Sequence, residues 1–181
     1  PEEVNFLMRL LSRYIVRERK KMIKNNIRFR CIGQLDKIPK DIRTQVEATM
    51  QATSQNTGLV LTFALSYGGR QEITQAVKNI ASLTKEGKIS VDDINEELIS
   101  GMMQTAPLPD PDLMIRTSGE WRLSNFLPWQ SVYTELYFSD VLWPDFSEKD
   151  LELALDSYKN RERRFGKTTS QVVETISSHL S

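Results

Sequence analysis

The stretch Gly58-Leu-Val-Leu-Thr-Phe-Ala-Leu-Ser66 is apolar almost throughout, and it decides the fold. A short apolar run of this kind predicts a strand that is covered on both faces, as in a parallel sheet. The pair Gly68-Gly69 follows as a turn, and beyond it apolar residues recur at helical spacing. These residues are Ile73, Ala76, Val77, Ile80 and Leu83. A buried strand that turns into an amphipathic helix is the unit from which α/β proteins are built.

The same alternation of strands and helices extends along the rest of the chain. Apolar periodicity and turn residues predict helices at residues 1–26, 39–56, from 90 to beyond 98, and 147–164, and strands at 27–32, 113–115 and 133–138. Ser90 and Asp93 hold the two positions of a capping box at the start of one of these helices. The predicted fold is therefore α/β, with a mainly parallel sheet flanked by helices. Because the chain opens on a helix, we expect the first strands of the sheet to be missing.

Composition excludes several classes of protein. The chain has 181 residues, of which 39% are hydrophobic and 27% charged, so we expect a folded domain rather than disorder. Its 24 basic and 24 acidic side chains balance, which gives no general attraction to nucleic acid. One cysteine and one histidine allow neither an internal disulfide nor a zinc site of the usual ligands. No apolar run approaches the ~18 residues that suggest a membrane span, so we expect a soluble protein of a reducing compartment.

The densest group of functional side chains is Arg116-Thr-Ser-Gly-Glu-Trp-Arg-Leu-Ser-Asn125. It follows the predicted strand 113–115, and ligands of open α/β sheets bind at the carboxyl ends of strands. Two arginine forks, several hydroxyl groups and a glycine suit a diphosphate. Ser124 is also predicted to begin a helix whose positive end would face the anion. The alternative is a polar loop in which the arginines pair with Glu120.

Three other features each allow two interpretations. Glu135 interrupts an apolar strand, so its carboxylate needs either a metal ion or an arginine partner. Tyr67-Gly-Gly-Arg70 is either a phosphate-binding turn or a site of close packing. Arg161-Glu-Arg-Arg-Phe-Gly166 either completes the dipole of a helix end or clamps an anion. Packing and the helix end are the simpler interpretations of the last two.

Taken together, these motifs resemble a known family. The matching segments are Asp110-Pro-Asp-Leu-Met-Ile-Arg-Thr-Ser-Gly-Glu120, Arg122-Leu-Ser-Asn-Phe126, Tyr133-Thr-Glu-Leu-Tyr-Phe138, Leu142-Trp-Pro-Asp-Phe146 and Arg161-Glu-Arg-Arg-Phe-Gly166. In this order they resemble the cis-prenyltransferases, the undecaprenyl diphosphate synthase family. The resemblance runs from residue 3 to about 166. It implies a cis-prenyltransferase domain at 1–166 and a C-terminal tail at 167–181.

The resemblance also implies a reaction and a set of site residues. The family extends an allylic diphosphate, such as farnesyl diphosphate, by Mg²⁺-dependent condensation with isopentenyl diphosphate. The product is a polyprenyl diphosphate such as undecaprenyl diphosphate. Arg116, Arg122 and Ser124 would hold the diphosphate of isopentenyl diphosphate, and Glu135 would help to place Mg²⁺. Arg164 and Gly166 match an Arg-x-Gly element that reaches the diphosphate site across the interface of a homodimer.

Location follows from the same resemblance. The family works in the cytoplasm, or in the plastid stroma of a eukaryote, and its lipid product implies proximity to a membrane surface. The strand at 59–66 would line the apolar tunnel that receives the growing chain, although its sequence suits an ordinary buried strand equally well.

Two departures from the family pattern bear on the activity. Trp121 stands where some members carry a polar residue that assists the metal. The family's Asp-Gly-Asn-Gly-Arg-Trp loop, with its essential aspartate, is not in this sequence, so no catalytic residue is assigned here. We interpret the chain as part of an active cis-prenyltransferase. A non-catalytic partner subunit that supplies Arg164 and Gly166, and an unrelated anion-binding module, are the alternatives.

Overall fold

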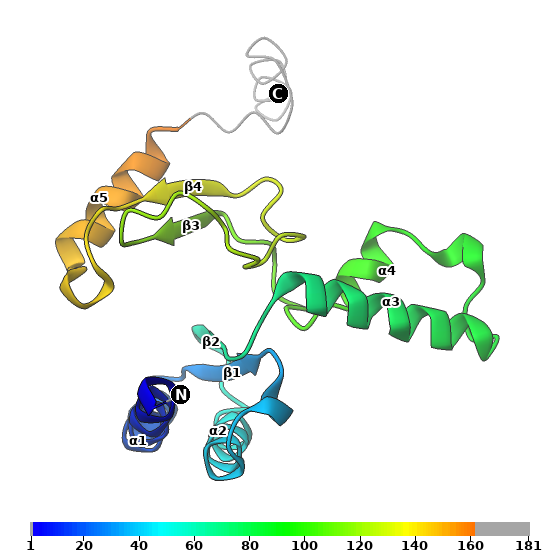
Figure 1. Cartoon of the computed structure of the whole chain (residues 1–181), viewed down its shortest axis with the longest axis horizontal. Coiled ribbons are helices and arrows are strands. Elements are labelled where there is room, and N and C mark those ends of the chain that lie inside the picture. The colour runs from blue at the N-terminus through cyan, green and yellow to red at the C-terminus, as the bar shows by residue number, and fades with distance from the viewer. Residues whose placement is uncertain (1, 162–181) are drawn as a thin grey trace. The chain divides into compact units, whose positions relative to one another are not determined.

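A computed structural model describes residues 2–161 of the chain (Figure 1). The predicted tail at 167–181 and the predicted site residues Arg164 and Gly166 lie outside this described part. The chain divides into two compact units, one ending at Pro109 and the other beginning at Asp110. Each unit has its own parallel strands and helices, and each is described by itself.

The first unit contains two parallel strands and their helices. Its elements are α1 (Glu2–Lys24), β1 (Arg28–Ile32), α2 (Lys40–Ala52), β2 (Val60–Ala64), α3 (Gly69–Lys85) and α4 (Glu96–Gly101), with 3₁₀ turns at Leu35–Lys37 and Val91–Asp93. β1 and β2 pair in parallel, with Arg28 opposite Val60 and Ile32 opposite Ala64. A crossover helix, α2, connects them, as parallel pairing requires.

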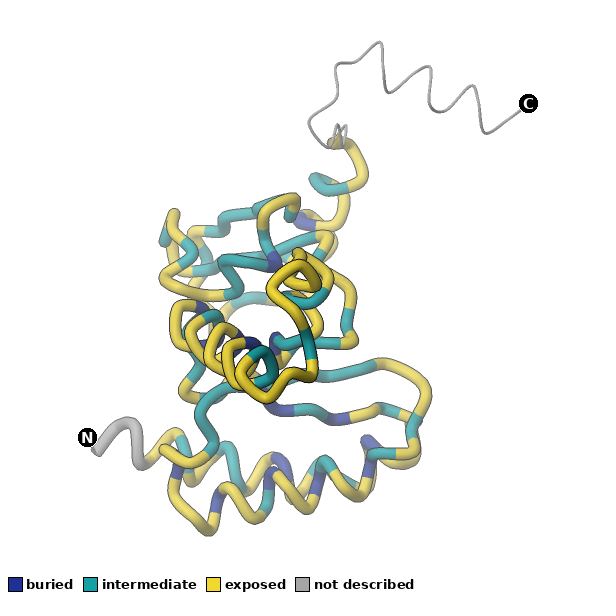
Figure 2. Tube along the Cα trace, turned by 90° about the vertical axis from the view of Figure 1, so that its right-hand side faces the viewer, coloured by how far each residue is buried: buried dark blue, intermediate teal, exposed yellow. Residues whose placement is uncertain are grey.

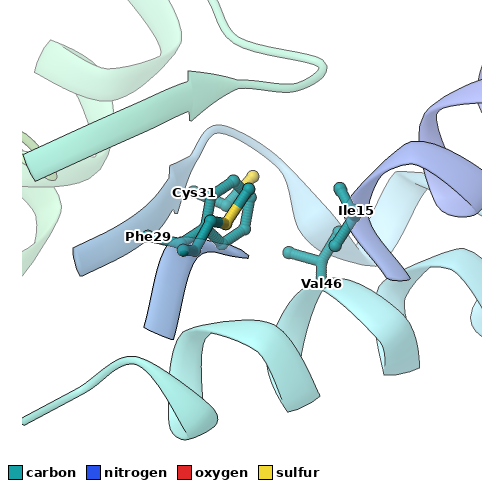
Figure 3. Packing of buried hydrophobic residues seen from close by; sticks show 5 residues of the cluster. Ile15, Phe29, Cys31 and Val46 are labelled. Atoms are coloured by element: carbon teal, nitrogen blue, oxygen red, sulfur yellow. The ribbon is translucent and has the colours of Figure 1, made fainter. Parts of the chain in front are cut away.

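The core of this unit lies where α1 and α2 meet the β1–β2 pair. Its buried residues are Ile15, Met22, Phe29, Cys31 and Val46, four of which are labelled in Figure 3. The rings of Phe29 and Phe63 meet edge to face at 5.3 Å, an arrangement that aromatic pairs favour. Burial raises the pKa of the Cys31 thiol to about 11.

β2 packs against the core of this unit with alternate residues. Leu61, Phe63 and Leu65 contact the core, because every second side chain of a strand points to the same face. On the opposite face Val60 and Thr62 are half-buried and Ala64 is exposed. Within this unit, the predicted burial is therefore seen on the face of β2 that the core covers.

Two helix predictions also need correction. In α3, Ala76 and Ile80 are buried as expected, but Val77 is exposed. The Ser90–Asp93 capping box forms, yet it closes only the 3₁₀ turn Val91–Asp93. α4 begins separately, because the Asn95 side chain caps it by accepting a hydrogen bond from the Leu98 N–H at 2.8 Å. Figure 2 shows the general pattern of buried positions spaced among exposed ones along the helices.

The second unit has the same parallel arrangement on a smaller scale. It contains β3 (Leu113–Arg116), β4 (Glu135–Phe138), α5 (Glu148–Lys159) and a 3₁₀ turn at Trp143–Asp145. β3 and β4 pair in parallel, with Leu113 opposite Glu135 and Arg116 opposite Phe138. The α/β fold with parallel strands is confirmed, and the four strands seen in residues 2–161 form two hydrogen-bonded pairs.

The boundaries in the second unit differ from those predicted. β4 begins at Glu135, because Tyr133 and Thr134 belong to a turn, and the Thr134 hydroxyl donates to the Pro111 carbonyl at 2.7 Å. α5 ends at Lys159 rather than at residue 164. None of the helices in the described part of the chain combines the length and the apolar character that a membrane crossing requires.

Candidate functional site

The candidate site is the loop that leaves the carboxyl end of β3, here called the arginine loop (residues 116–125). Backbone hydrogen bonds tie it to the end of β4. The Ser139 N–H donates to the Arg116 carbonyl at 2.8 Å, and the Gly119 N–H donates to the Ser139 carbonyl at 3.0 Å. The Ser118 N–H donates to the Val141 carbonyl at 2.9 Å. The loop is thus fixed to the strand pair at the edge where ligands of parallel sheets bind.

The side chain of Arg116 brings the three predicted diphosphate-binding residues together. Its Nη1 donates to the Ser124 hydroxyl at 3.0 Å and also contacts the carbonyl of Arg122. Arg116 is therefore the centre of the loop, while Ser124 and Arg122 lie on the returning half. The expectation that these three residues share one site is consistent with this geometry.

Glu120 lies between the two arginines. It forms an ion pair with Nη1 of Arg122 and a longer one with Nη2 of Arg116 at 3.9 Å. The alternative interpretation of this loop, in which its arginines pair with Glu120, is therefore also present in the structure. Two guanidinium groups around one carboxylate leave an excess of positive charge. The Arg122 side chain is 65% exposed, so a more highly charged anion can reach it.

The backbone of the arginine loop is held in left-handed conformations. Ser118, Gly119, Ser124 and Asn125 have φ values of 70°, 65°, 48° and 65°. Residues other than glycine adopt this region at a cost of about 1–3 kcal/mol each, and they do so preferentially at functional sites. The prediction that Ser124 begins a helix is wrong, because residues 124 to 133 form turns and bends.

Trp121 gives the loop an apolar side. Its ring stacks on Phe138 at 5.3 Å with an interplanar angle of 12°, although the residue is 74% exposed. An indole ring offers no oxygen to a cation such as Mg²⁺, which prefers oxygen ligands. Stacking on β4 is therefore the interaction that the structure gives to this position.

Glu135 lies at the other end of β4 from the arginine loop. The register places it opposite Leu113, three residues before Arg116, which corresponds to about 10 Å along the strand. Its Oε2 accepts a hydrogen bond from Nη1 of Arg161 at 2.9 Å, and its side chain is 27% exposed. Of the two interpretations of Glu135, the arginine partner is the one seen in the structure.

The residue pattern did not reveal that Arg161 contacts Glu135. Arg161 was expected to complete a helix end or to clamp an anion, but it lies beyond the end of α5 and contacts β4 instead. Because 26 residues separate it from Glu135, no local spacing connects the two. Only the tertiary structure shows the pair.

A second polar network lies at the carboxyl ends of β1 and β2. The buried carboxylate of Glu72 accepts hydrogen bonds from the Tyr67 hydroxyl at 2.5 Å and the Gln104 N–H at 2.8 Å. The Gln104 side chain in turn accepts one from the Gly33 N–H at 2.6 Å. These residues line a cavity of about 280 Å³. Gly33 is required there, since a Cβ at this residue would lie 2.0 Å from the Leu65 carbonyl oxygen.

This network bears on the Tyr67-Gly-Gly-Arg70 motif. Gly69 is buried at the first position of α3, and Tyr67 is hydrogen-bonded to Glu72 on the same helix. These contacts fit the interpretation of the motif as a site of close packing.

Comparisons with known proteins decide the family. A family model described as "Putative undecaprenyl diphosphate synthase" matches residues 1–166. An isoprenyl transferase from Geobacter sulfurreducens is 51% identical over 170 residues, which are 94% of this chain and 69% of that protein. The chain belongs to the undecaprenyl diphosphate synthase family. An isoprenyl transferase from Porphyromonas gingivalis is 47% identical over 94% of the chain and 67% of its own length.

Solved structures of the family agree with the fold. Lavandulyl diphosphate synthase from Lavandula x intermedia, solved in complex with dimethylallyl diphosphate, has a TM-score of 0.89 at 36% identity. That match covers 92% of this chain and 72% of the synthase. A probable undecaprenyl diphosphate synthase from Campylobacter jejuni has a TM-score of 0.80 at 35% identity, over 92% and 76% of the two chains. The chain spans 64% to 69% of the length of three of the isoprenyl transferases that it matches.

Proposed function

We propose that the protein acts in cis-prenyl chain elongation, as a (2Z)-prenyl diphosphate synthase. It would condense isopentenyl diphosphate with an allylic diphosphate such as farnesyl diphosphate and release a polyprenyl diphosphate such as undecaprenyl diphosphate. Relatives with the name isoprenyl transferase and a neighbour solved with an allylic diphosphate support the substrate class. The observation that carries the proposal is the convergence of Arg116, Arg122 and Ser124 in one strand-end loop.

In this proposal the arginine loop binds the diphosphate of isopentenyl diphosphate. Arg122 reaches the anion from the exposed side, and Arg116 and Ser124 reach it from within the loop. Arginine forks match phosphate oxygens in two parallel hydrogen bonds. The incoming diphosphate takes the place of the Glu120 carboxylate, because it carries more negative charge. The loop keeps its shape during this exchange, since its backbone is fixed to β4.

The reaction itself requires bond changes that the bound substrates supply. The allylic carbon–oxygen bond breaks and the diphosphate leaves with the electron pair. The terminal carbon of isopentenyl diphosphate then attacks the cationic carbon, and loss of a proton leaves a cis double bond. The part of the described residues in this reaction is to hold isopentenyl diphosphate in register at the arginine loop.

Glu135 is suited to bind a Mg²⁺ ion whose other ligands are mainly phosphate oxygens of the substrate. Mg²⁺ is usually held by one or two carboxylates together with substrate phosphates, and Glu135 offers one partly buried carboxylate. Among residues 2–161 no cluster of three metal-ligating side chains exists, so an all-protein cage is not what this part of the chain provides. When bound, the ion would neutralise the diphosphate.

We further propose a homodimer that works in the cytoplasm or plastid stroma, close to a membrane surface. The resemblance of Arg164 and Gly166 to a cross-subunit element supports the dimer. The second unit also exposes large apolar side chains, among them Trp143 at 73% and Leu142 at 57%, which a partner subunit would cover.

Incorporation of labelled isopentenyl diphosphate into lipid-extractable product tests the function. The full protein is incubated with farnesyl diphosphate and either Mg²⁺ or a chelator. We expect Mg²⁺-dependent product, and we expect Arg122→Ala to weaken isopentenyl diphosphate binding. Arg43→Ala, which removes an arginine from a helix ion pair on α2, serves as the control. If this protein gives no product by itself but gives product when a second subunit is added, it is the non-catalytic partner of the alternative interpretation. If it binds no diphosphate at all, both the synthase and the partner-subunit interpretations are refuted.

A further inference from the structure

Arg161 makes two contacts with β4 through a single nitrogen atom. Its Nη1 donates to Oε2 of Glu135 at 2.9 Å and to the backbone carbonyl of Leu136 at 2.8 Å. Both acceptors belong to the first two residues of the strand. The hydrogen bond to the Leu136 carbonyl does not depend on the Glu135 carboxylate, so it fixes the guanidinium of Arg161 independently.

The contact with Glu135 is one-sided. Arg161 engages Oε2, and within residues 2–161 the other carboxylate oxygen, Oε1, has no protein partner. The pair is also only partly exposed, at 27% for Glu135 and 37% for Arg161. A carboxylate held by one oxygen in a partly buried place has a defined orientation and one oxygen left for a ligand.

We propose that Arg161 is a positioning residue that orients Glu135 for a divalent cation, holding Oε2 so that Oε1 takes the ion. This inference rests on the proposed role of Glu135 in Mg²⁺ binding. Carboxylates that ligate metals are generally hydrogen-bonded by neighbouring groups, and loss of such a neighbour weakens metal binding by about 10- to 100-fold. Arg161 stands in that relation to Glu135.

An opposite role for Arg161 is conceivable on charge alone. A guanidinium beside a carboxylate could compete with the cation and have to leave before it binds. The Leu136 carbonyl argues against this, because it retains the guanidinium whether or not Glu135 is occupied. The cation also arrives with a diphosphate, whose negative charge offsets repulsion between Arg161 and the metal.

The test measures Mn²⁺ binding to the full protein by electron paramagnetic resonance in the presence of inorganic pyrophosphate. We expect Arg161→Gln to weaken Mn²⁺ binding tenfold or more, and Arg161→Lys, which keeps the charge, to recover part of the loss. Arg43→Gln is the matched control, since Arg43 forms a comparable ion pair with Glu47 at 3.1 Å. It should leave Mn²⁺ binding unchanged.

Each other outcome has a definite meaning. Unchanged or tighter Mn²⁺ binding in Arg161→Gln would overturn the positioning role. Unchanged binding in Glu135→Gln would instead refute the metal role of Glu135, and so part of the proposed function. Binding of pyrophosphate without metal should be normal in Arg161→Gln, which separates the effect from damage to the arginine loop. If Arg161→Gln fails to fold, Arg161→Lys decides, with wild-type affinity counting against the proposal.

Discussion

The guanidinium of Arg116 donates to the Ser124 hydroxyl at 3.0 Å and so closes the arginine loop on itself. Arg122, by contrast, makes its side-chain contact with Glu120 and is largely exposed. The two arginines that the family motif treats alike therefore have different places in the structure. Arg116 holds the loop together as well as facing the anion, whereas Arg122 is available mainly for the anion.

This difference predicts different outcomes for two substitutions. Arg122→Ala should weaken pyrophosphate binding by roughly 10- to 100-fold, because hydrogen bonds to a charged group contribute about 1.5–3 kcal/mol. It should leave the melting temperature almost unchanged. Arg116→Ala should weaken binding and also lower the melting temperature, since the loop loses its internal contacts. Calorimetric titration and thermal melting check both; equal melting curves for the two variants would contradict the distinction.

Trp121 should report binding at the loop. Its ring is exposed and stacked on Phe138, one residue from Arg122, so replacement of Glu120 by a diphosphate should alter its surroundings. We expect a saturable change in tryptophan fluorescence on addition of pyrophosphate. Trp121→Phe should abolish the change while keeping affinity within about threefold, because an aromatic ring can still stack. Persistence of the signal in that variant would assign it to another tryptophan.

The core of the first unit should depend strongly on Phe29. This side chain is 1% exposed and packs edge to face against Phe63. Phe29→Ala should lower the free energy of unfolding by about 3–5 kcal/mol, the usual cost of a phenylalanine-sized cavity. Val77→Ala is the control, since exposed substitutions usually stay within about 0.5 kcal/mol. Chemical denaturation measures both, and a similar loss in the two variants would refute the assigned core.

The start of α5 should be sensitive to acid. The Ser147 hydroxyl and backbone N–H both donate to Asp150, at 2.6 and 2.8 Å, and these bonds hold the pKa of that carboxyl below its usual range. A lowered pKa means that the stabilisation is present above the pKa of the unfolded chain and is lost as the pH falls through the folded value. Hydrogen exchange in α5 should therefore accelerate below about pH 4.

Substitution isolates this cap. Ser147→Ala should cost about 1 kcal/mol of stability at neutral pH and flatten the acid response. Ser82→Ala, at an exposed position of α3, should do neither. An acid response that survives in Ser147→Ala would show that another carboxylate controls it.

Local patterns in the sequence predicted the order of elements and the parallel pairing well. The α/β alternation, the Ser90–Asp93 capping box and the grouping of Arg116, Arg122 and Ser124 all arise from residues close together in the chain. Such features depend on backbone periodicity and on short hydrogen bonds, which neighbouring residue types determine.

Some errors arise where contacts between distant segments decide the structure. β4 starts late because Thr134 bonds to Pro111, which lies 23 residues earlier in the chain. The start of α4 is a different case, because its Asn95 cap is a local signal that the prediction missed. Ser124 has a left-handed backbone because Arg116 holds the returning loop. The partner of Glu135 could not be chosen from spacing, since metal and arginine satisfy a partly buried carboxylate equally well.

The buried thiol of Cys31 has a practical consequence. It is the single cysteine among 181 residues, it lies in the core beneath α1 and α2, and its raised pKa keeps it as an unreactive thiol at neutral pH. A thiol reagent can modify it only when these helices detach from β1. The rate of alkylation under native conditions therefore measures how often this layer opens, and no label has to be introduced to observe it.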